Sequence, residues 1–315
     1  MGVRGRRFTG APDLIGDLMK KLFLFLFLLL FPLNLFAKIN VVATLPIFGN
    51  LAEEIGGDRV LVTSLARGNQ DPHFLDAKPS YAVALNKADL LVHGGLDLEV
   101  GWLPPVLNQA RNGKILSGTP GNVNLSQGLQ ILEIPKVLLD RSMGDVHPLG
   151  NPHTWLEPNN VKLMVANIYQ HLIQVDPQGK DYYLNRFQNF LQRMNSKLLQ
   201  WDVQIKNFRN KEVITYHKSF SYFANWTGLK IIAMIEPKPG IPPSSSRVSD
   251  ILKMLPNYKV KAILVENFYP KKIPQYLSEK TKIPMLDLPT DTGEEGLNTY
   301  FDLMDHLIGE INKIL

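Results

Sequence analysis

Residues 182–208 read YYLNRFQNFLQRMNSKLLQWDVQIKNF, and apolar side chains return in them at intervals of three and four. This spacing places the apolar side chains on one face of an α-helix. The pattern holds for about 25 residues, longer than the 8–20 residues of most helices in globular proteins. A coiled-coil helix is the weaker alternative, because only one segment has the pattern and no ladder of charged residues accompanies it. We therefore predict one long, rigid helix.

Short apolar or β-branched segments alternate with helical patterns on both sides of this helix, as in α/β folds with mainly parallel sheets. Before it, strands are predicted at residues 40–45, 60–65, 89–94 and 131–134. After it, the pattern starts again, with strands predicted at residues 212–217, 230–235, 261–266 and 284–288. The sequence thus predicts two α/β lobes, residues 38–176 and 209–315, joined by the segment 177–208.

The first 37 residues differ in composition from the rest. Lys20 and Lys21 precede an unbroken apolar run at residues 22–31, and the small residue Ala37 follows, which is the pattern of a cleavable signal peptide. A membrane-spanning helix is the alternative, but it needs about 20 apolar residues, and this run has roughly half that number. Translation can begin at Met1 or at Met19, because the residues before Met19 match no leader pattern. We expect residues 1–37 to direct export to the periplasm.

Charge and cysteine content limit the possible functions. The 315 residues carry a formal net charge of +5, of which five basic and two acidic residues in the leader contribute +3, leaving +2 for residues 38–315. No run of basic residues interleaved with aromatic ones remains, which argues against nucleic-acid binding. The absence of cysteine excludes disulfides and thiolate metal ligands, and it predicts no lipid attached to cysteine after the leader. Any metal ligands are then expected to be His, Asp or Glu.

Four such residues are predicted to converge in a cleft between the lobes, because ligands of open α/β sheets bind at the carboxyl ends of the strands. His73 follows one predicted strand, His217 ends another, and Asp291 follows a third. His153 lies in the loop GNPHTWLEP (150–158), where Pro152 restricts the backbone that leads to it. Three imidazoles and one carboxylate form a set suited to Zn²⁺ and tolerable for Mn²⁺.

Three further residues are expected near this cleft. His147 and His93 are candidates for auxiliary metal contacts, and a hydrogen-bonded structural role is the alternative for each. Glu266 ends a predicted strand of the second lobe, where it is a reserve ligand or, in the favoured interpretation, orients a ligand histidine. His171 and His306 lie within helical patterns and are expected to be ordinary surface histidines.

Five segments in this order resemble the zinc and manganese solute-binding proteins of ABC transporters: DPHFLDAKPSYAVALNKADLLV (71–92), GNPHTWLEP (150–158), TYHKSFSYFANWTGL (215–229), EPKPGIPPSSSRVSDI (236–251) and LPTDTGEEG (288–296). The resemblance covers residues 39–315. It implies two Rossmann-like lobes joined by one long helix, with the metal between them. It also implies four metal ligands, the same set that the strand ends indicate: His73, His153, His217 and Asp291.

Two features depart from the family pattern. Many zinc-specific members carry a long His- and acid-rich loop ahead of the second ligand, whereas the segment LDRSMGDVHPLG (139–150) has His147 as its single histidine. An ion-gathering loop is therefore not expected. Manganese members typically have Glu at the third ligand position, where this chain has His217, and this difference favours zinc.

These features predict a periplasmic receptor that captures a divalent metal, zinc before manganese, and delivers it to a membrane permease driven by a cytoplasmic ATPase. We expect a monomer that performs no catalysis, and the long helix predicts only a small closure between the lobes. The alternatives are a manganese or mixed receptor, a metal-chelate receptor, an adhesin and a zinc hydrolase. A hydrolase needs an open coordination position, which Asp291 would fill, and the chain has no HExxH motif.

Overall fold

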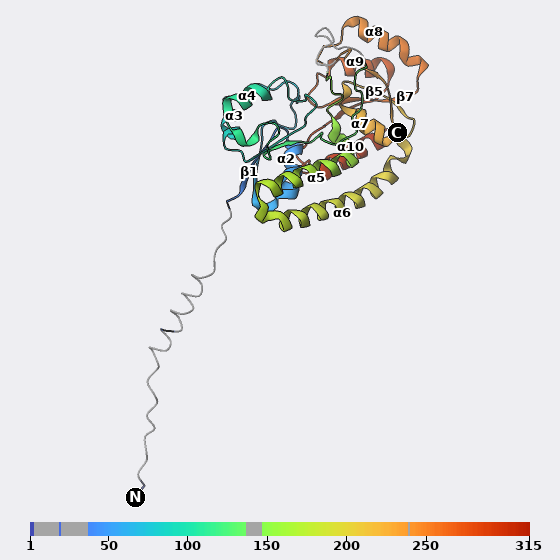
Figure 1. Cartoon of the computed structure of the whole chain (residues 1–315). Coiled ribbons are helices and arrows are strands. Elements are labelled where there is room, and N and C mark those ends of the chain that lie inside the picture. Colours follow the sequence, from blue (N-terminus) through green and yellow to red (C-terminus); the bar gives the residue numbers. More distant parts are fainter. Residues whose placement is uncertain (3–18, 20–36, 137–146, 239) are drawn as a thin grey trace. The chain divides into compact units, whose positions relative to one another are not determined.

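The computed structural model describes residues 1–2, 19, 37–136, 147–238 and 240–315. The chain forms two units, Met1–Ala37 and Lys38–Leu315, and the second contains both sheets (Figure 1). The predicted signal peptide lies outside the described residues, apart from positions 1–2, 19 and 37. Within the described part of the chain, no helix is both long enough and apolar enough to span a bilayer.

The first sheet has four parallel strands in the order β2-β1-β3-β4: β1 (Ile39–Ala43), β2 (Val60–Ser64), β3 (Leu90–His93) and β4 (Asn122–Asn124). Four longer helices belong to this lobe: α2 (Pro46–Gly56), α3 (Pro79–Asn86), α4 (Leu103–Ala110) and α5 (Pro158–Val175). Three of them begin at proline, whose fixed φ and missing N–H suit the first helical turn. The chain changes direction across the sheet between β1 and β3, and such a switch point is where parallel α/β sheets bind ligands.

One predicted strand of this lobe is wrong. Residues 131–134 form a loop, and the fourth strand is β4, ten residues earlier in the chain. Glu133 has a φ of 55°, in the left-handed region, which is incompatible with an extended strand. The strands predicted at residues 40–45, 60–65 and 89–94 are confirmed to within two residues at each end.

The second sheet repeats the topology of the first, in the order β6-β5-β7-β8. Its parallel strands are β5 (Glu212–Thr215), β6 (Lys230–Met234), β7 (Val260–Glu266) and β8 (Met285–Leu288). The helices of this lobe are α7 (Ser221–Thr227), α8 (Ser245–Met254), α9 (Lys272–Thr281) and α10 (Tyr300–Asn312). All four strands predicted after residue 210 are confirmed. The chain therefore has two α/β lobes, as predicted.

The predicted long helix is α6 (Lys180–Gln204), with 25 residues and a short helix at either end, η5 (Pro177–Gly179) and η6 (Ile205–Phe208). Figure 1 shows α6 running alongside α5 and on toward the second lobe. Its buried side chains form one stripe: Tyr183, Phe190, Met194 and Trp201. This stripe lies on the side where α6 packs against α2 and α5 of the first lobe and α10 of the second.

A single hydrophobic core passes through both lobes. It includes Val41 and Phe48 of the first lobe, Met194 of α6, and Phe223 and Leu264 of the second lobe. A separate, smaller cluster lies in the second lobe alone. Because the lobes share a core, a wide opening between them would expose apolar surface to water. The arrangement therefore favours small relative movements of the lobes.

Candidate metal centre

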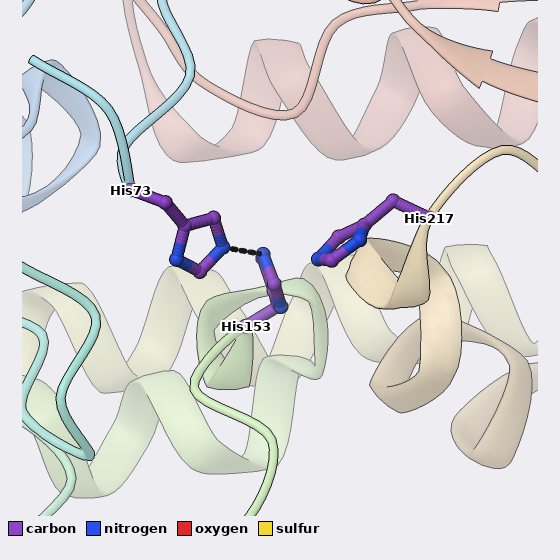
Figure 2. Close-up of side chains that lie close together, drawn as sticks. All are labelled: His73, His153 and His217. Atoms are coloured by element: carbon purple, nitrogen blue, oxygen red, sulfur yellow. Dashed lines mark hydrogen bonds between the residues drawn. The ribbon is translucent and has the colours of Figure 1, made fainter. Parts of the chain in front are cut away.

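Three buried histidines from distant parts of the chain meet between the lobes (Figure 2). His73 lies in the loop after β2, His153 precedes the short helix η4 (Thr154–Leu156), and His217 follows β5. Each offers one ring nitrogen, and the three nitrogens lie within 4.8 Å of one another. Their side chains point toward a common centre, and the residues are only 4%, 2% and 2% exposed. The structure thus brings together three of the four residues of the predicted ligand set.

His153 is held in one orientation by Asn151. The Asn151 Oδ1 atom accepts a hydrogen bond from the backbone N–H of His153 at 3.0 Å and lies 2.9 Å from its Nδ1. The amide group is itself oriented, because its Nδ2 donates to the carbonyl of Lys218 at 3.0 Å. Nδ1 of His153 therefore carries the proton, since Oδ1 can only accept. The other nitrogen, Nε2, faces the cluster and lies 3.1 Å from Nε2 of His73.

His217 is held by a carboxylate instead. Its Nδ1 lies 2.5 Å from Oε2 of Glu236, which comes two residues after β6. The other oxygen of Glu236 accepts a hydrogen bond from the backbone N–H of Gly240 at 2.8 Å, so the carboxylate is fixed as well. Nε2 of His217 has no hydrogen-bond partner among the described residues and points toward the other two rings. An imidazole bound in this way by a carboxylate is the usual arrangement of a metal-ligating histidine.

The three imidazoles differ in their electrostatics. Burial lowers the pKa of His73 and of His153 well below the usual value, and the neighbouring imidazoles lower both further. Burial by itself would lower the pKa of His217 too, but the hydrogen bond to Glu236 and the charge of nearby carboxylates outweigh it and raise that pKa. His73 and His153 are therefore neutral near pH 7, the form that binds metal, whereas His217 lies in a negative field.

The fourth predicted ligand, Asp291, is buried in the loop after β8 but does not belong to this three-histidine group. Its Oδ1 accepts hydrogen bonds from the backbone N–H of Ile47 and of Thr292, both at 2.7 Å. Ile47 lies in the first turn of α2, so this carboxylate of the second lobe is bound at a helix N-terminus of the first. Burial raises the pKa of Asp291 to about 8, against the two backbone hydrogen bonds, which lower it. Its role as a ligand stays a prediction.

Of the auxiliary candidates, His147 lies next to the cluster. Its ring centroid is 4.9 Å from that of His73, and it lines a cavity of about 50 Å³ together with His153 and His217. Burial, followed by the charge of His217, lowers the pKa of His147 to about 4. The ring is therefore neutral near pH 7.

The other two auxiliary candidates differ in position. His93 ends β3, where its Nε2 lies 3.1 Å from Oδ1 of Asn122, and it lines a separate cavity of about 670 Å³ in the first lobe. Glu266 ends β7 and is fully buried. Burial raises the pKa of Glu266 to about 7, and the charge of His217 opposes that shift. Glu266 is thus close enough to act on His217 electrostatically. His93, in contrast, pairs with Asn122.

Two carboxylates that the sequence reasoning missed also lie at the cluster. Glu236 binds His217, and Oδ1 of Asp71 accepts a hydrogen bond from the backbone N–H of His73 at 3.0 Å. Asp71 also contributes to the raised pKa of His217. Both carboxylates follow strands of the parallel sheets on the same side as the histidines, so the rule that indicated the ligands covers them too.

Comparison with known proteins agrees with this arrangement. The family described as "Zinc-uptake complex component A periplasmic", or ZnuA, matches residues 41–314. A manganese ABC transporter substrate-binding lipoprotein, PsaA of Streptococcus pneumoniae, is 25% identical over 278 residues, which cover 85% of this chain and 86% of that protein. A metal ABC transporter substrate-binding lipoprotein of Lactococcus lactis subsp. lactis is 24% identical and covers 88% of both chains.

Among solved structures, a crystal structure of ZnuA has the same fold, with a TM-score of 0.75 and 23% identity. The alignment covers 88% of this chain and 99% of that one. The family match and the shared fold both extend over almost all of the unit Lys38–Leu315. The chain therefore belongs to the ZnuA family, the zinc and manganese substrate-binding proteins of metal ABC transporters.

Proposed function

We propose that this chain is an exported receptor that binds one divalent transition-metal ion, zinc in preference to manganese, and hands it to a membrane permease powered by a cytoplasmic ATPase. The observation that carries the proposal is the meeting of three buried ring nitrogens from both lobes. Buried polar groups normally have hydrogen-bond partners, yet Nε2 of His217 has none among the described residues. A metal ion at the centre of the cluster would satisfy all three imidazoles.

Four residues are proposed as the ligands, two from each lobe: His73 and His153 from the first, His217 and Asp291 from the second. Zinc in proteins is bound by four ligands in a tetrahedron, with nitrogen atoms about 2.0–2.1 Å from the ion. The three ring nitrogens are close enough for small movements to bring them onto one ion. An ion held by both lobes also ties them together. Release to a permease then requires one lobe to withdraw its ligands from the other.

The preference for zinc rests on the donor atoms. Imidazole nitrogens disfavour Ca²⁺ and Mg²⁺, which prefer shells of oxygen. Between the transition metals, zinc stands above manganese in the usual order of affinity, and three imidazoles suit it better. Manganese is the alternative, since the relative from Streptococcus pneumoniae is named for manganese transport.

Transport, and not catalysis, is the function that the ligand set supports. A zinc hydrolase leaves one coordination position open for water, whereas Asp291 would occupy the fourth position here. Export to the periplasm rests on the predicted signal peptide and on the family of the chain. Several relatives are named lipoproteins, and this chain has no cysteine that could carry a lipid, so we propose a form without a lipid anchor.

Metal titration of the purified, metal-stripped protein tests the proposal. We expect isothermal titration calorimetry and elemental analysis to give one zinc ion per chain. In direct competition at equal free concentrations, we expect zinc to displace manganese. Retention of manganese against equimolar zinc would overturn the zinc preference and leave the metal receptor standing. If neither ion binds, the receptor function itself is wrong.

A further inference from the structure

The loop that carries Asp291 is anchored to the first lobe. The indole N–H of Trp155, two residues after His153, donates a hydrogen bond to the carbonyl of Thr290 at 2.7 Å. The backbone N–H of Ile47 donates to the carboxylate of Asp291 itself, also at 2.7 Å. Thr290, Asp291 and Trp155 are all buried. The position of Asp291 therefore depends on how closely this loop of the second lobe sits on the first lobe.

Gly68, in the loop after β2, lies directly against the next residue of that loop, Thr292. Both residues are buried. A Cβ atom at position 68 would lie 2.1 Å from the carbonyl oxygen of Thr292, whereas real Cβ atoms essentially never make contacts shorter than 3.0 Å. The backbone does not itself require glycine, because the φ of Gly68 is not in the left-handed region. Glycine is therefore needed here for the contact between the lobes.

A side chain at position 68 would push the Asp291 loop away from the first lobe. Relief of the contact with Thr292 requires a shift of about 1 Å. A zinc–oxygen bond is only about 2.0–2.2 Å long, so a shift of this size breaks the bond unless the ion follows the carboxylate. An ion that follows it must lengthen its bonds to His73 and His153, which belong to the first lobe. The close contact at Gly68 therefore favours a small ion over a large one.

We propose that Gly68 is a specificity-determining residue, which sets the size of the bound divalent ion by allowing the Asp291 loop to rest on the first lobe. This inference rests on the proposed function, in which Asp291 supplies the fourth ligand. Gly68 does not touch the ion. It acts by fixing the distance between one carboxylate and the two imidazoles of the first lobe. With glycine the site suits zinc, and with a larger residue the site becomes wider and suits a larger ion.

Competition between zinc and cadmium tests this role, because both ions have a filled d shell and cadmium is the larger. For Gly68→Ala we expect zinc affinity to fall by about tenfold or more and cadmium affinity by less than about threefold, measured by calorimetry with a chelator as competitor. X-ray absorption at the zinc edge of Gly68→Ala should show the three nitrogen ligands kept and the bond to the Asp291 oxygen lengthened or lost.

Gly121→Ala is the matched control. Gly121 is also buried and has an ordinary φ, and an added Cβ would lie 2.3 Å from the carbonyl oxygen of Lys114 and 2.6 Å from that of Asp89. All three residues belong to the first lobe. Through the same kind of clash, this variant should lower the melting temperature of the metal-free protein without changing the ratio of zinc to cadmium affinity. The control thereby separates a general loss of stability from a change in the site.

An equal loss of zinc and cadmium affinity in Gly68→Ala would overturn the role in ion size, and unchanged affinities would show that the contact does not position Asp291. A fall of the ratio in Gly121→Ala would also overturn the proposal. Should Gly68→Ala fail to fold by circular dichroism, Trp155→Phe takes its place, since it removes the hydrogen bond that holds the same loop, and the ratio should again fall.

The wild type separates this inference from the proposed function. If the wild-type protein binds neither zinc nor cadmium, the proposed function and this inference both fall. Wild-type binding of zinc, with a ratio of zinc to cadmium affinity that Gly68→Ala leaves unaltered, rejects this inference alone.

Discussion

The two lobes prepare their histidines in opposite ways. In the first lobe, His153 is held by the neutral amide of Asn151, and burial lowers its pKa. In the second lobe, His217 is held by the carboxylate of Glu236, and its pKa is raised in spite of burial. The two rings nevertheless lie side by side, with centroids 5.1 Å apart. Two imidazoles that are equally buried therefore have pKa values shifted in opposite directions, because the Nδ1 atom of each has a different partner.

This difference assigns separate tasks to the lobes. The first lobe offers imidazoles that are already neutral and can bind a cation without losing a proton. The second lobe places the carboxyl groups of Glu236 and Glu266 near His217, where both raise its pKa. Neither half is a complete site. A metal receptor built in this way holds its ion only while both lobes are in contact with it.

The largest effect is expected from removing a ligand of the first lobe. His153→Ala should lower zinc affinity by at least tenfold, which corresponds to about 1.4 kcal/mol. The circular dichroism of the metal-free protein should stay nearly the same, because the loop that carries His153 lies outside the strands of the sheet. Calorimetry measures the affinity, and His306→Ala on α10 is the matched control. Unchanged affinity in His153→Ala would remove His153 from the ligand set.

A smaller effect is expected from the group that supports the ligand of the second lobe. Glu236→Gln keeps the size of the side chain but removes its charge, so His217 becomes a weaker donor and the ion loses a compensating charge. We expect zinc affinity to fall by about tenfold, as for other residues that orient metal ligands. Asn151→Ala is the matched variant of the first lobe. We expect it to lower zinc affinity by less than Glu236→Gln does, since it removes no charge. An equal loss of zinc affinity in Glu236→Gln and Asn151→Ala would contradict the proposal that the two lobes support their histidines differently.

The pH dependence of zinc binding should be set by His217, the histidine of the second lobe. Protons compete with the metal for ring nitrogens, and the pKa of His217 is raised while those of His73 and His153 are lowered. As pH falls through the pKa of His217, this ring becomes protonated first and affinity declines. We therefore expect zinc affinity to drop between pH 7.5 and about 5.5.

Glu236→Gln removes the negative charge that helps to raise the pKa of His217, so the decline in affinity should move to lower pH. Asn151→Ala should leave the position of the decline unchanged. Calorimetry over this pH range measures both. A flat profile in the wild type would count against a site of three histidines.

The smallest effect concerns the choice of metal. His217→Glu replaces a nitrogen donor by oxygen, which suits manganese better than the imidazole does. We expect the ratio of zinc to manganese affinity to narrow by about a few-fold, with zinc still ahead. Competition calorimetry on the variant and the wild type measures this ratio. If the ratio of zinc to manganese affinity is unchanged or larger in His217→Glu, the third ligand does not favour zinc in the way proposed.

Much of the fold follows from the sequence because periodicity is a local property. The stripe Tyr183, Phe190, Met194 and Trp201 of α6 could be recognised from spacing alone. The loop around Glu133 could not. Its apolar residues resemble a strand, but the backbone N–H of Leu132 donates to the hydroxyl of Tyr222 at 3.0 Å and its carbonyl accepts from Asn151 at 2.9 Å. The contact with Tyr222 crosses to the second lobe, the contact with Asn151 joins two distant segments of the first lobe, and no local sequence pattern predicts either of them.

The histidines of the site could be found from strand ends, but Glu236 depends on strand register. Thr215 of β5 lies opposite Met234 of β6, so His217 and Glu236 come two residues beyond the same pair. This alignment exists only because the register shifts between Val213 and Ile214. Without the shift, Glu212 opposite Lys230 would place Ile235 beside His217. The strand-end rule places both residues at the same edge of the sheet, but a one-residue irregularity brings the carboxylate of Glu236 beside the imidazole of His217, and sequence patterns do not predict that register.

The most direct test is X-ray absorption spectroscopy at the zinc edge, combined with anomalous diffraction from crystals of the zinc-loaded protein. We expect one ion between the lobes, bound by Nε2 of His73, His153 and His217 and by one carboxylate oxygen of Asp291. The bond lengths should be about 2.0–2.1 Å to nitrogen and about 2.0–2.2 Å to oxygen. An ion bound by residues of one lobe alone, or with fewer than three imidazoles, would contradict the two-lobe site.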